Sequence, residues 1–334
     1  MLIQHTPSFW YDQKGRKQKL LSAVLAPFGR AYGWIVQKRF DLYFPVPMER
    51  PIICVGNLTA GGAGKTPVAI SLAGLLQDKG YNPHFLSRGY GGAEEGPLQV
   101  NPGRDTVVDV GDEPLLLVEK APTWVSVNRP QGAQAAFDTG ANMVIMDDGF
   151  QNPVIYKDFS LVVVDGAVGF GNKRIFPAGP LREPVPFGLG RAHAVVIVGD
   201  DTSGCLADIR RHADIPVLNA TLKPAPSNPD LFGKVVYAFA GIGRPDKFKE
   251  SLIAAGAVIE GWGSYPDHFA YEEEDLKELM ASAETRGAVV VTTAKDHVRL
   301  PASLKPKVQV FSVAIEWQNP DEILQLIEAA LQKR

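Results

Sequence analysis

The sequence is poor in cysteine. Its 334 residues include only Cys54 and Cys205, which are far apart and do not have the spacing of a metal site. A disulfide framework is therefore not indicated, and a reducing cytoplasm is the natural compartment. We expect both thiols to be structural.

An excess of charge of either sign is also missing. The chain has 34 lysine and arginine residues against 37 aspartate and glutamate residues, which leaves a formal net charge of −3. No overall field attracts nucleic acid, and the body of the chain has no basic stripe interleaved with aromatic residues. Nucleic acid is therefore not an expected partner.

Long apolar runs are absent as well. Pro27 and Arg30 interrupt the apolar stretch near the N-terminus, so it predicts neither a transmembrane helix nor the apolar core of a signal peptide. The composition, 45% apolar and 21% charged, is that of an ordinary folded protein with room for about two domains.

The chain does contain a glycine-rich loop between an apolar strand, expected at residues 51–55, and a helix, expected at 68–76. Glycines let backbone N–H groups turn toward a polyphosphate, Lys65 adds a charge for the outer phosphates, and the Thr66 hydroxyl can hold Mg²⁺. The usual motif begins with glycine, whereas this chain has Thr59 at that position. We therefore expect Gly61 and Gly62 to make the tight turn of the loop. The pattern predicts that a nucleoside triphosphate binds to Thr59, Ala60, Gly61, Gly62, Ala63, Gly64, Lys65 and Thr66.

Acidic residues end a second apolar strand, expected at 144–146. Asp147 and Asp148 stand where phosphate-loop proteins hold Mg²⁺ directly or through water, at the strand end that faces the crevice. A plain turn at Asp148 is the alternative. A further acidic pair, Asp112 and Glu113, precedes a helix-like stretch and by itself indicates only a helix start.

Basic charge gathers near the N-terminus, where residues 14–39 contain no acid and apolar residues recur at spacings of three and four. Such a segment is typical of a helix on an anionic membrane surface. A helix packed on the protein's own core, with a solvated basic face, is the alternative. The basic residues are Lys14, Arg16, Lys17, Lys19, Arg30, Lys38 and Arg39, and the apolar ones are Leu20, Leu21, Val24, Leu25, Phe28, Tyr32 and Ile35.

Apolar β-branched runs alternate with helical patterns in the rest of the chain, which indicates an α/β fold with a parallel sheet. Three prolines within residues 223–229 suggest a linker. We expect a basic membrane-associating segment at 1–49, a P-loop nucleotide-binding domain at 50–226, and a smaller α/β domain at 227–334. The smaller domain should have strands at 235–239, 288–291 and 308–313 and helices near 247–255, 272–286 and 320–332.

Six short stretches, in order along nearly the whole chain, resemble the signature stretches of the tetraacyldisaccharide 4′-kinase family of lipid A biosynthesis. They lie at residues 55–58, 87–92, 111–114, 147–151, 176–184 and 265–269. The resemblance implies a lipid kinase that uses ATP and Mg²⁺ to phosphorylate the 4′-hydroxyl of tetraacyldisaccharide 1-phosphate, giving the bisphosphorylated lipid IVA. It also implies a peripheral or monotopic place on the cytoplasmic face of the bacterial inner membrane, whose anionic leaflet would attract the basic segment.

The resemblance also implies residue roles. Magnesium would be held by Thr66, Asp147 and Asp148, while Lys65 contacts the transferred phosphate. Asp112 would be the base that accepts the hydroxyl proton, and His268 would support it. Because His268 lies in the second domain, this pairing requires the two domains to face each other, and domain closure would gate catalysis. Substrate-binding roles are implied for Asn57, Arg88, Glu113, Arg129, Gln151 and Arg182.

Some positions depart from the family pattern, namely Asn152, Phe269 and Ala294, and no role is carried over to them. Two other functions remain open at this point. One is a soluble P-loop kinase of a small metabolite. The other is a GTPase-type switch, which should carry an Asn-Lys-x-Asp motif, whereas here Asn172-Lys173 is followed by Arg174-Ile175.

Overall fold

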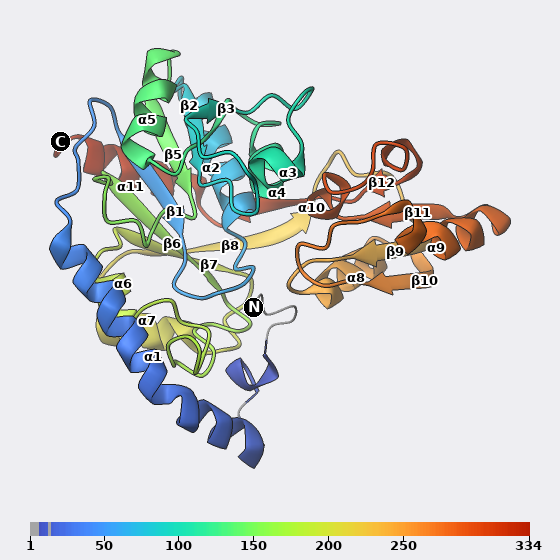
Figure 1. Ribbon diagram of the computed structural model, residues 1–334, viewed down its shortest axis with the longest axis horizontal. Coiled ribbons are helices and arrows are strands. Elements are labelled where there is room, and N and C mark those ends of the chain that lie inside the picture. The colour runs from blue at the N-terminus through green and yellow to red at the C-terminus, as the bar shows by residue number, and fades with distance from the viewer. Residues whose placement is uncertain (1–6, 13–14) are drawn as a thin grey trace.

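The computed structural model describes residues 7–12 and 15–334, so Lys14 lies outside the described residues. Figure 1 shows two units, each built on its own sheet, with a long N-terminal helix along the outside of the larger one. The predicted α/β class, a parallel-dominated sheet accompanied by a smaller α/β unit, is confirmed.

The large unit is built on a sheet that has nine strands within the described residues, in the order β13-β8-β7-β6-β1-β5-β2-β4-β3. Neighbouring strands run parallel except at the two edges, where β13 and β3 are antiparallel to their partners. The strands are β1 (Ile52–Gly56), β2 (Pro83–Ser87), β3 (Leu98–Gln99), β4 (Thr123–Val125), β5 (Met143–Asp147), β6 (Phe159–Asp165), β7 (Ala194–Val198), β8 (Val217–Pro224) and β13 (Val313–Trp317). The helices are a 3-10 turn at Ser8–Trp10, α1 (Arg16–Leu42), α2 (Lys65–Asp78), α3 (Val107–Val110), α4 (Asp112–Leu117), α5 (Arg129–Asp138), α6 (Val185–Leu189), α7 (Cys205–His212) and α11 (Pro320–Leu331).

The small unit has a parallel sheet in the order β10-β9-β11-β12. Its strands are β9 (Val235–Ala240), β10 (Val258–Ser264), β11 (Val289–Thr292) and β12 (Gln309–Val310). Its helices are α8 (Pro245–Ala254), α9 (Glu273–Thr285), α10 (Ala294–His297) and a 3-10 turn at Lys305–Lys307. The helices near 247–255 and 272–286 and the strands at 235–239 and 288–291 are thus where the sequence predicts them.

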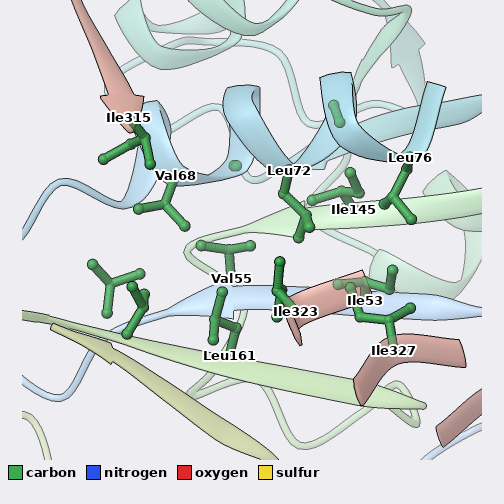
Figure 2. Packing of buried hydrophobic residues seen from close by; sticks show 14 of the residues in the cluster. Ile53, Val55, Val68, Leu72, Leu76, Ile145, Leu161, Ile315, Ile323 and Ile327 are labelled. Atoms are coloured by element: carbon green, nitrogen blue, oxygen red, sulfur yellow. The ribbon is translucent and has the colours of Figure 1, made fainter. Parts of the chain in front are cut away.

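Both faces of the large sheet are covered, which explains why its central strands are apolar on both sides. On one face, Leu72 of α2 and Ile323 of α11 pack over β1 (Figure 2), and each such buried side chain contributes on the order of 2 kcal/mol through burial. On the other face, α5, α6 and α7 cover a second cluster that also contains Cys54 and Cys205, both buried and free. The packing holds the carboxyl ends of β1 and β5 at a fixed place, where the phosphate loop and Asp147 begin.

The chain passes between the two units twice, once in residues 225–234 and again in residues 311–312. Asn228 ties the two crossings together, because its Nδ2 donates to the Ser312 carbonyl (2.8 Å) and its Oδ1 accepts from the Ser312 N–H (2.7 Å). The small unit is therefore shorter than the domain expected at 227–334, because the C-terminal part of that range belongs to the large unit. The expected strand at 308–313 is split between the two sheets, and β13 and α11 return to the large unit, where the apolar face of α11 packs on α2 and β6.

Helix α1 continues through Pro27 and faces the large unit with small residues. Ser22, Gly29 and Gly33 are buried, and a side chain added at Gly29 would lie 2.5 Å from the Ile175 carbonyl oxygen. The Ser22 hydroxyl donates to the carbonyl of Ala178 (2.7 Å). Large apolar side chains instead face outward, among them Leu20, Phe28 and Trp34, which are 67%, 66% and 61% exposed. No helix in the described part of the chain is both long and apolar enough to cross a membrane.

Candidate active site

A cleft of about 2710 Å³ lies between the two units. On the large-unit side it is lined by the phosphate loop together with Asp147 and Asp148, and on the small-unit side by His268 and Lys295. The sequence-predicted residues Glu113, Arg88, Arg129, Gln151 and Arg182 also line it. Most of the residues proposed from the sequence are thus gathered in one space, although they come from positions far apart in the chain.

The phosphate loop connects β1 to α2, as predicted. Its left-handed positions are Gly61 and Gly64, with φ of 110° and 88°, so the second special turn residue is Gly64 rather than the expected Gly62. The Ala60 N–H donates to the Pro180 carbonyl (2.7 Å), which anchors the start of the loop to the 176–184 segment. Lys65 opens α2, so the loop leads into a helix N-terminus, where the dipole favours a phosphate.

Asp147 ends β5 and is almost completely buried where it borders the cleft. The Thr66 hydroxyl donates to its Oδ2 (2.9 Å), while its buried Oδ1 has no hydrogen-bond partner among the described residues. Burial, reinforced by the negative charge of Glu113, raises the pKa of Asp147 to about 7. A carboxylate held in this way, with one oxygen unpaired, is suited to binding a cation.

Asp148 adopts a left-handed backbone with φ of 53° and turns its side chain toward two cations. Arg182 Nη1 lies 2.8 Å from Oδ1, and Lys65 Nζ lies 3.7 Å from the same atom. Burial alone would raise the pKa of Asp148, but the charges of Lys65 and Arg182 outweigh it and lower the pKa. Lys65 and Arg182 are therefore held at the mouth of the phosphate loop by one carboxylate.

Gln151 and Asn57 form hydrogen bonds that hold Arg182 and the start of the phosphate loop in place. Gln151 donates from Nε2 to the Asn57 carbonyl and to Glu183 Oε1, both at 2.8 Å, and its Oε1 accepts from Arg182 (3.4 Å). Asn57 is buried and lies outside the cleft lining, where its Nδ2 donates to the Thr59 carbonyl (2.7 Å). Asn57 thus braces the phosphate loop, and its predicted substrate contact stays a prediction.

Two arginines line another part of the cleft. Arg88 is exposed, whereas Arg129 is buried and donates to the Ser87 carbonyl (3.0 Å). Burial and the neighbouring charge of Arg88 lower the pKa of Arg129 to about 10, still far above neutrality. The pair presents two positive charges to the cleft, a suitable environment for an anionic group.

Asp112 and His268 meet across the interface of the two units. His268 Nδ1 lies 2.9 Å from Asp112 Oδ2, and His268 itself has a left-handed backbone with φ of 60°. Asp112 is buried behind His268 and lies outside the cleft lining. Burial would raise the pKa of Asp112, but the hydrogen bond from His268 and the charges of Lys295, His268 and Arg299 hold it at about 2.

Sequence reasoning missed three groups around this interface. Lys295 Nζ lies 3.2 Å from His268 Nε2, and Arg299 Nε lies 3.7 Å from Asp112 Oδ2. Elsewhere in the interface, buried Asp165 at the end of β6 pairs with Arg244 (2.6 Å) and Lys247 (2.7 Å) at the start of α8. No local sequence pattern predicts these contacts, because each one joins residues more than 25 positions apart in the sequence.

The donors at the loop fit Mg²⁺. The described residues contain no group of three or more histidine, cysteine, aspartate or glutamate side chains that could hold a metal ion by themselves. Mg²⁺ does not need one, since it usually takes one or two carboxylates and completes its shell with water and substrate phosphates. Asp147, with its unpaired buried oxygen, and the hydroxyl of Thr66 supply that kind of partial site.

Fold and site together define an ATP-dependent phosphotransferase of the P-loop class. A family model described as LpxK, tetraacyldisaccharide-1-P 4′-kinase, matches residues 21–332. The chain belongs to this family, as the sequence resemblance predicted.

Curated relatives agree over nearly the full length. A tetraacyldisaccharide 4′-kinase from Paramagnetospirillum magneticum is 51% identical, covering 96% of this chain and 97% of its own. One from Gluconobacter oxydans is 46% identical over 98% of this chain and 100% of its own. Among solved structures, the "apo" form of LpxK from Aquifex aeolicus in complex with ATP has a TM-score of 0.74 and 27% identity, covering 93% of this chain and 99% of that one.

Proposed function

We propose that this protein transfers the γ-phosphate of ATP to the 4′-hydroxyl of tetraacyldisaccharide 1-phosphate, giving the bisphosphorylated lipid. The observation that carries the proposal is the single cleft in which the phosphate loop and Asp147 of the large unit face His268 of the small unit. A phosphate donor held on one wall and a proton acceptor on the other are what phosphoryl transfer to a hydroxyl requires. Family membership supplies the identity of the lipid acceptor.

The phosphate loop and Lys65 bind the outer phosphates of ATP. Backbone N–H groups of the loop point toward the polyphosphate, and Lys65 exchanges its contact with Asp148 for the γ-phosphate. Thr66 and Asp147 would hold Mg²⁺, and the bound ion would supply positive charge that offsets the charge of the phosphates. Arg182, already beside Lys65 through Asp148, lies where it can steady the transferred group.

His268 is the group that takes the proton from the acceptor hydroxyl, and Asp112 holds it in place. The sequence resemblance assigns these roles the other way round, with Asp112 as base. The geometry favours the exchange, because His268 lines the cleft at 39% side-chain exposure whereas Asp112 is enclosed and, with a pKa of about 2, is a weak proton acceptor. Phosphoryl transfer has a loose transition state, so the imidazole needs only to orient the hydroxyl and accept its proton late.

Helix α1 docks the enzyme on an anionic membrane surface, the cytoplasmic face of the bacterial inner membrane, where an acylated acceptor is presented. Its small residues face the protein, which leaves the large apolar side chains Leu20, Phe28 and Trp34 directed outward. Basic residues on the same helix, Arg16, Lys17, Lys19, Arg30, Lys38 and Arg39, are exposed as well. Outward apolar groups flanked by basic charge suit a helix that inserts shallowly between anionic headgroups. The cleft reaches this helix, because Tyr32 and Arg39 belong to its lining.

One experiment tests the transfer. Purified protein is incubated with γ-labelled ATP, Mg²⁺ and detergent-dispersed tetraacyldisaccharide 1-phosphate, and the lipid is separated by thin-layer chromatography. We expect labelled bisphosphorylated lipid, and an acceptor whose 4′-hydroxyl is blocked should stay unlabelled. No label in the unblocked lipid, from a preparation that binds ATP, would refute the proposed function.

A further inference from the structure

A largely buried arginine, Arg191, lies where helix α1 passes α6 and the loop after β5. Its guanidinium carbon is 3.9 Å from the ring centre of Phe40, 4.5 Å from that of Phe150 and 4.6 Å from that of Phe187. These distances are those of cation–π contacts, which are strongest where the cation is shielded from water. Phe40 belongs to α1 and Phe187 to α6, which run side by side here (Figure 1), with 5.4 Å between the two ring centres. Arg191 therefore joins the C-terminal part of α1 to the segment that carries Phe150.

The same arginine is connected to the phosphate site through a chain of polar contacts. Arg191 Nη2 donates to Glu183 Oε2, and Glu183 has no exposed surface. The other oxygen of Glu183 accepts from Gln151 Nε2 (2.8 Å), and Gln151 Oε1 accepts from Arg182 (3.4 Å). Arg182 Nη1 in turn donates to Asp148 Oδ1 (2.8 Å). An unbroken series of hydrogen bonds thus leads from Arg191 to the carboxylate beside the phosphate loop.

Donors and acceptors match at every link of this chain. A carboxylate only accepts, and both oxygens of Glu183 are in use, one with Arg191 and one with Gln151. The amide nitrogen of Gln151 also faces the Asn57 carbonyl (2.8 Å), which leaves the amide oxygen for Arg182. Turning the amide over would place its NH₂ group against the guanidinium of Arg182, donor against donor. Glu183 therefore helps to fix which end of Gln151 meets Arg182.

Stability alone does not explain the buried pair of Arg191 and Glu183. Taking two charges out of water costs free energy, and apolar side chains of the same size often stabilise an interior as well or better. The pair does fix geometry, because Arg191 also donates to the carbonyls of Phe187 (3.3 Å) and Phe150 (3.2 Å). Phe150 is itself held against β1, since a side chain added at Gly56 would lie 2.4 Å from its Cβ.

We propose that Arg191 is a positioning residue for the phosphoryl transfer and that Phe40 lets α1 take part in this positioning. Arg191 fixes Glu183, Glu183 fixes Gln151, and the chain holds Arg182 at the transferred phosphate. The inference rests on the proposed function, in which Arg182 steadies the transferred group. Helix α1 then has a role besides membrane docking: its C-terminal part completes the scaffold of the active site, so turnover depends on it even where no membrane is present.

The first test changes the ring of Phe40 in the full-length protein. Phe40→Leu keeps an apolar side chain but has no ring face, Phe40→Tyr keeps the ring, and the control Phe44→Leu changes a ring just past α1 that is 94% exposed. With γ-labelled ATP and detergent-dispersed acceptor, we expect Phe40→Leu to lower kcat about tenfold, with KM for ATP within about twofold of wild type. Phe40→Tyr and Phe44→Leu should keep the wild-type kcat, and flotation of Phe40→Leu with anionic vesicles should be unchanged.

The second test separates positioning from neutralisation of a buried charge. Arg191→Met should lower kcat about 10²-fold, whereas Arg104→Met, which removes an exposed arginine paired with Asp105, should not. Arg191→Met also leaves Glu183 as an unpaired buried charge, so its unfolding temperature should fall. Adding Glu183→Gln removes that charge and should restore the unfolding temperature but not kcat, because an amide donates as well as accepts and no longer fixes Gln151.

A third measurement needs no lipid. Hydrogen exchange in residues 147–151 of the resting protein should be faster in Phe40→Leu and in Arg191→Met than in wild type, and unchanged in the two control variants. Unchanged exchange in both variants would overturn the proposal whether or not the wild-type protein phosphorylates the disaccharide. A wild-type protein that transfers no phosphate, with faster exchange in the variants, would count against the proposed function instead.

Two kinetic outcomes would also overturn the proposal. If kcat recovers together with the unfolding temperature in Arg191→Met with Glu183→Gln, Arg191 only neutralises a buried charge. If Phe40→Leu and Phe40→Tyr lose kcat equally, or lose activity only on vesicles and together with flotation, Phe40 is a packing residue or part of the membrane-facing surface. Should Arg191→Met not fold, Arg191→Lys takes its place, since it keeps the charge but lacks the planar fork that reaches three partners.

Discussion

Replacing Asp112 by asparagine removes a negative charge from the interface of the two units while keeping the size of the side chain. Asp112 holds Nδ1 of His268 in its protonated form, and an amide can present either a donor or an acceptor to that nitrogen. We therefore expect kcat to fall by about 10²–10⁴-fold, the range for loss of an oriented general base. The affinity for ATP should remain nearly unchanged, because Asp112 does not line the cleft.

The same substitution should weaken the fold in a pH-dependent way. The pKa of Asp112 is about 2, against an ordinary 3.8, so the folded state favours its charged form by about 2 kcal/mol. Because the folded pKa is the lower one, this stabilisation is fully present above about pH 4 and is lost as the pH falls from about 4 toward 2. The unfolding temperature of Asp112→Asn should therefore lie several degrees below wild type at pH 7, with the gap closing in acid.

Single-turnover assays and thermal melts check both effects, with Asp138→Asn on the exposed end of α5 as a matched control. Adding His268→Ala should cost little beyond Asp112→Asn, because the two side chains act as one unit. A kcat within threefold of wild type, or fully multiplicative losses in the double variant, would refute the reasoning.

Three further perturbations follow from the site and the interface. Lys65→Ala should lower kcat by about 10²–10³-fold in the label-transfer assay, whereas the exposed control Lys79→Ala should not; a wild-type rate in Lys65→Ala would make the loop structural. Phe28→Glu combined with Trp34→Glu should abolish flotation with anionic vesicles while sparing ATP binding, and deletion of residues 1–40 should do the same; unchanged flotation in both would contradict the membrane role of α1. Asp165→Asn leaves Arg244 and Lys247 without their shared partner, so we expect faster hydrogen exchange in α8 and a larger radius of gyration by small-angle scattering; identical values would show that this contact does not hold the units together.

The parts of the fold with strong local signals were predictable from the sequence. The strand before the phosphate loop and the buried strands β5, β6 and β7 are mostly apolar, and each ends at or just before a glycine or an aspartate. The family resemblance is likewise confirmed by the family match. The roles assigned to individual site residues stay predictions until variants are measured.

The end of the chain was not predictable in the same way. Residues 308–313 are a continuous β-favouring run with nothing that marks the change of sheet after Val310. Tertiary packing determines that β13 belongs to the large unit, because Ile315 and Trp317 pack into the core beside α2. The contact of Lys295 with His268 was hidden for the same reason, because it depends on how α10 meets the β10–α9 loop in space.

The double crossing between the units has a mechanical consequence. A single connecting segment would let the small unit bend and twist freely, whereas two segments joined through Asn228 and Ser312 restrict twisting. We therefore expect any relative movement of the units to carry His268 and Lys295 away from the phosphate loop and back along one path. Cutting the chain within 225–234 would leave the halves attached through 311–312 but would release the torsional restraint. Alignment across the cleft would then be lost although every residue that lines it was still present.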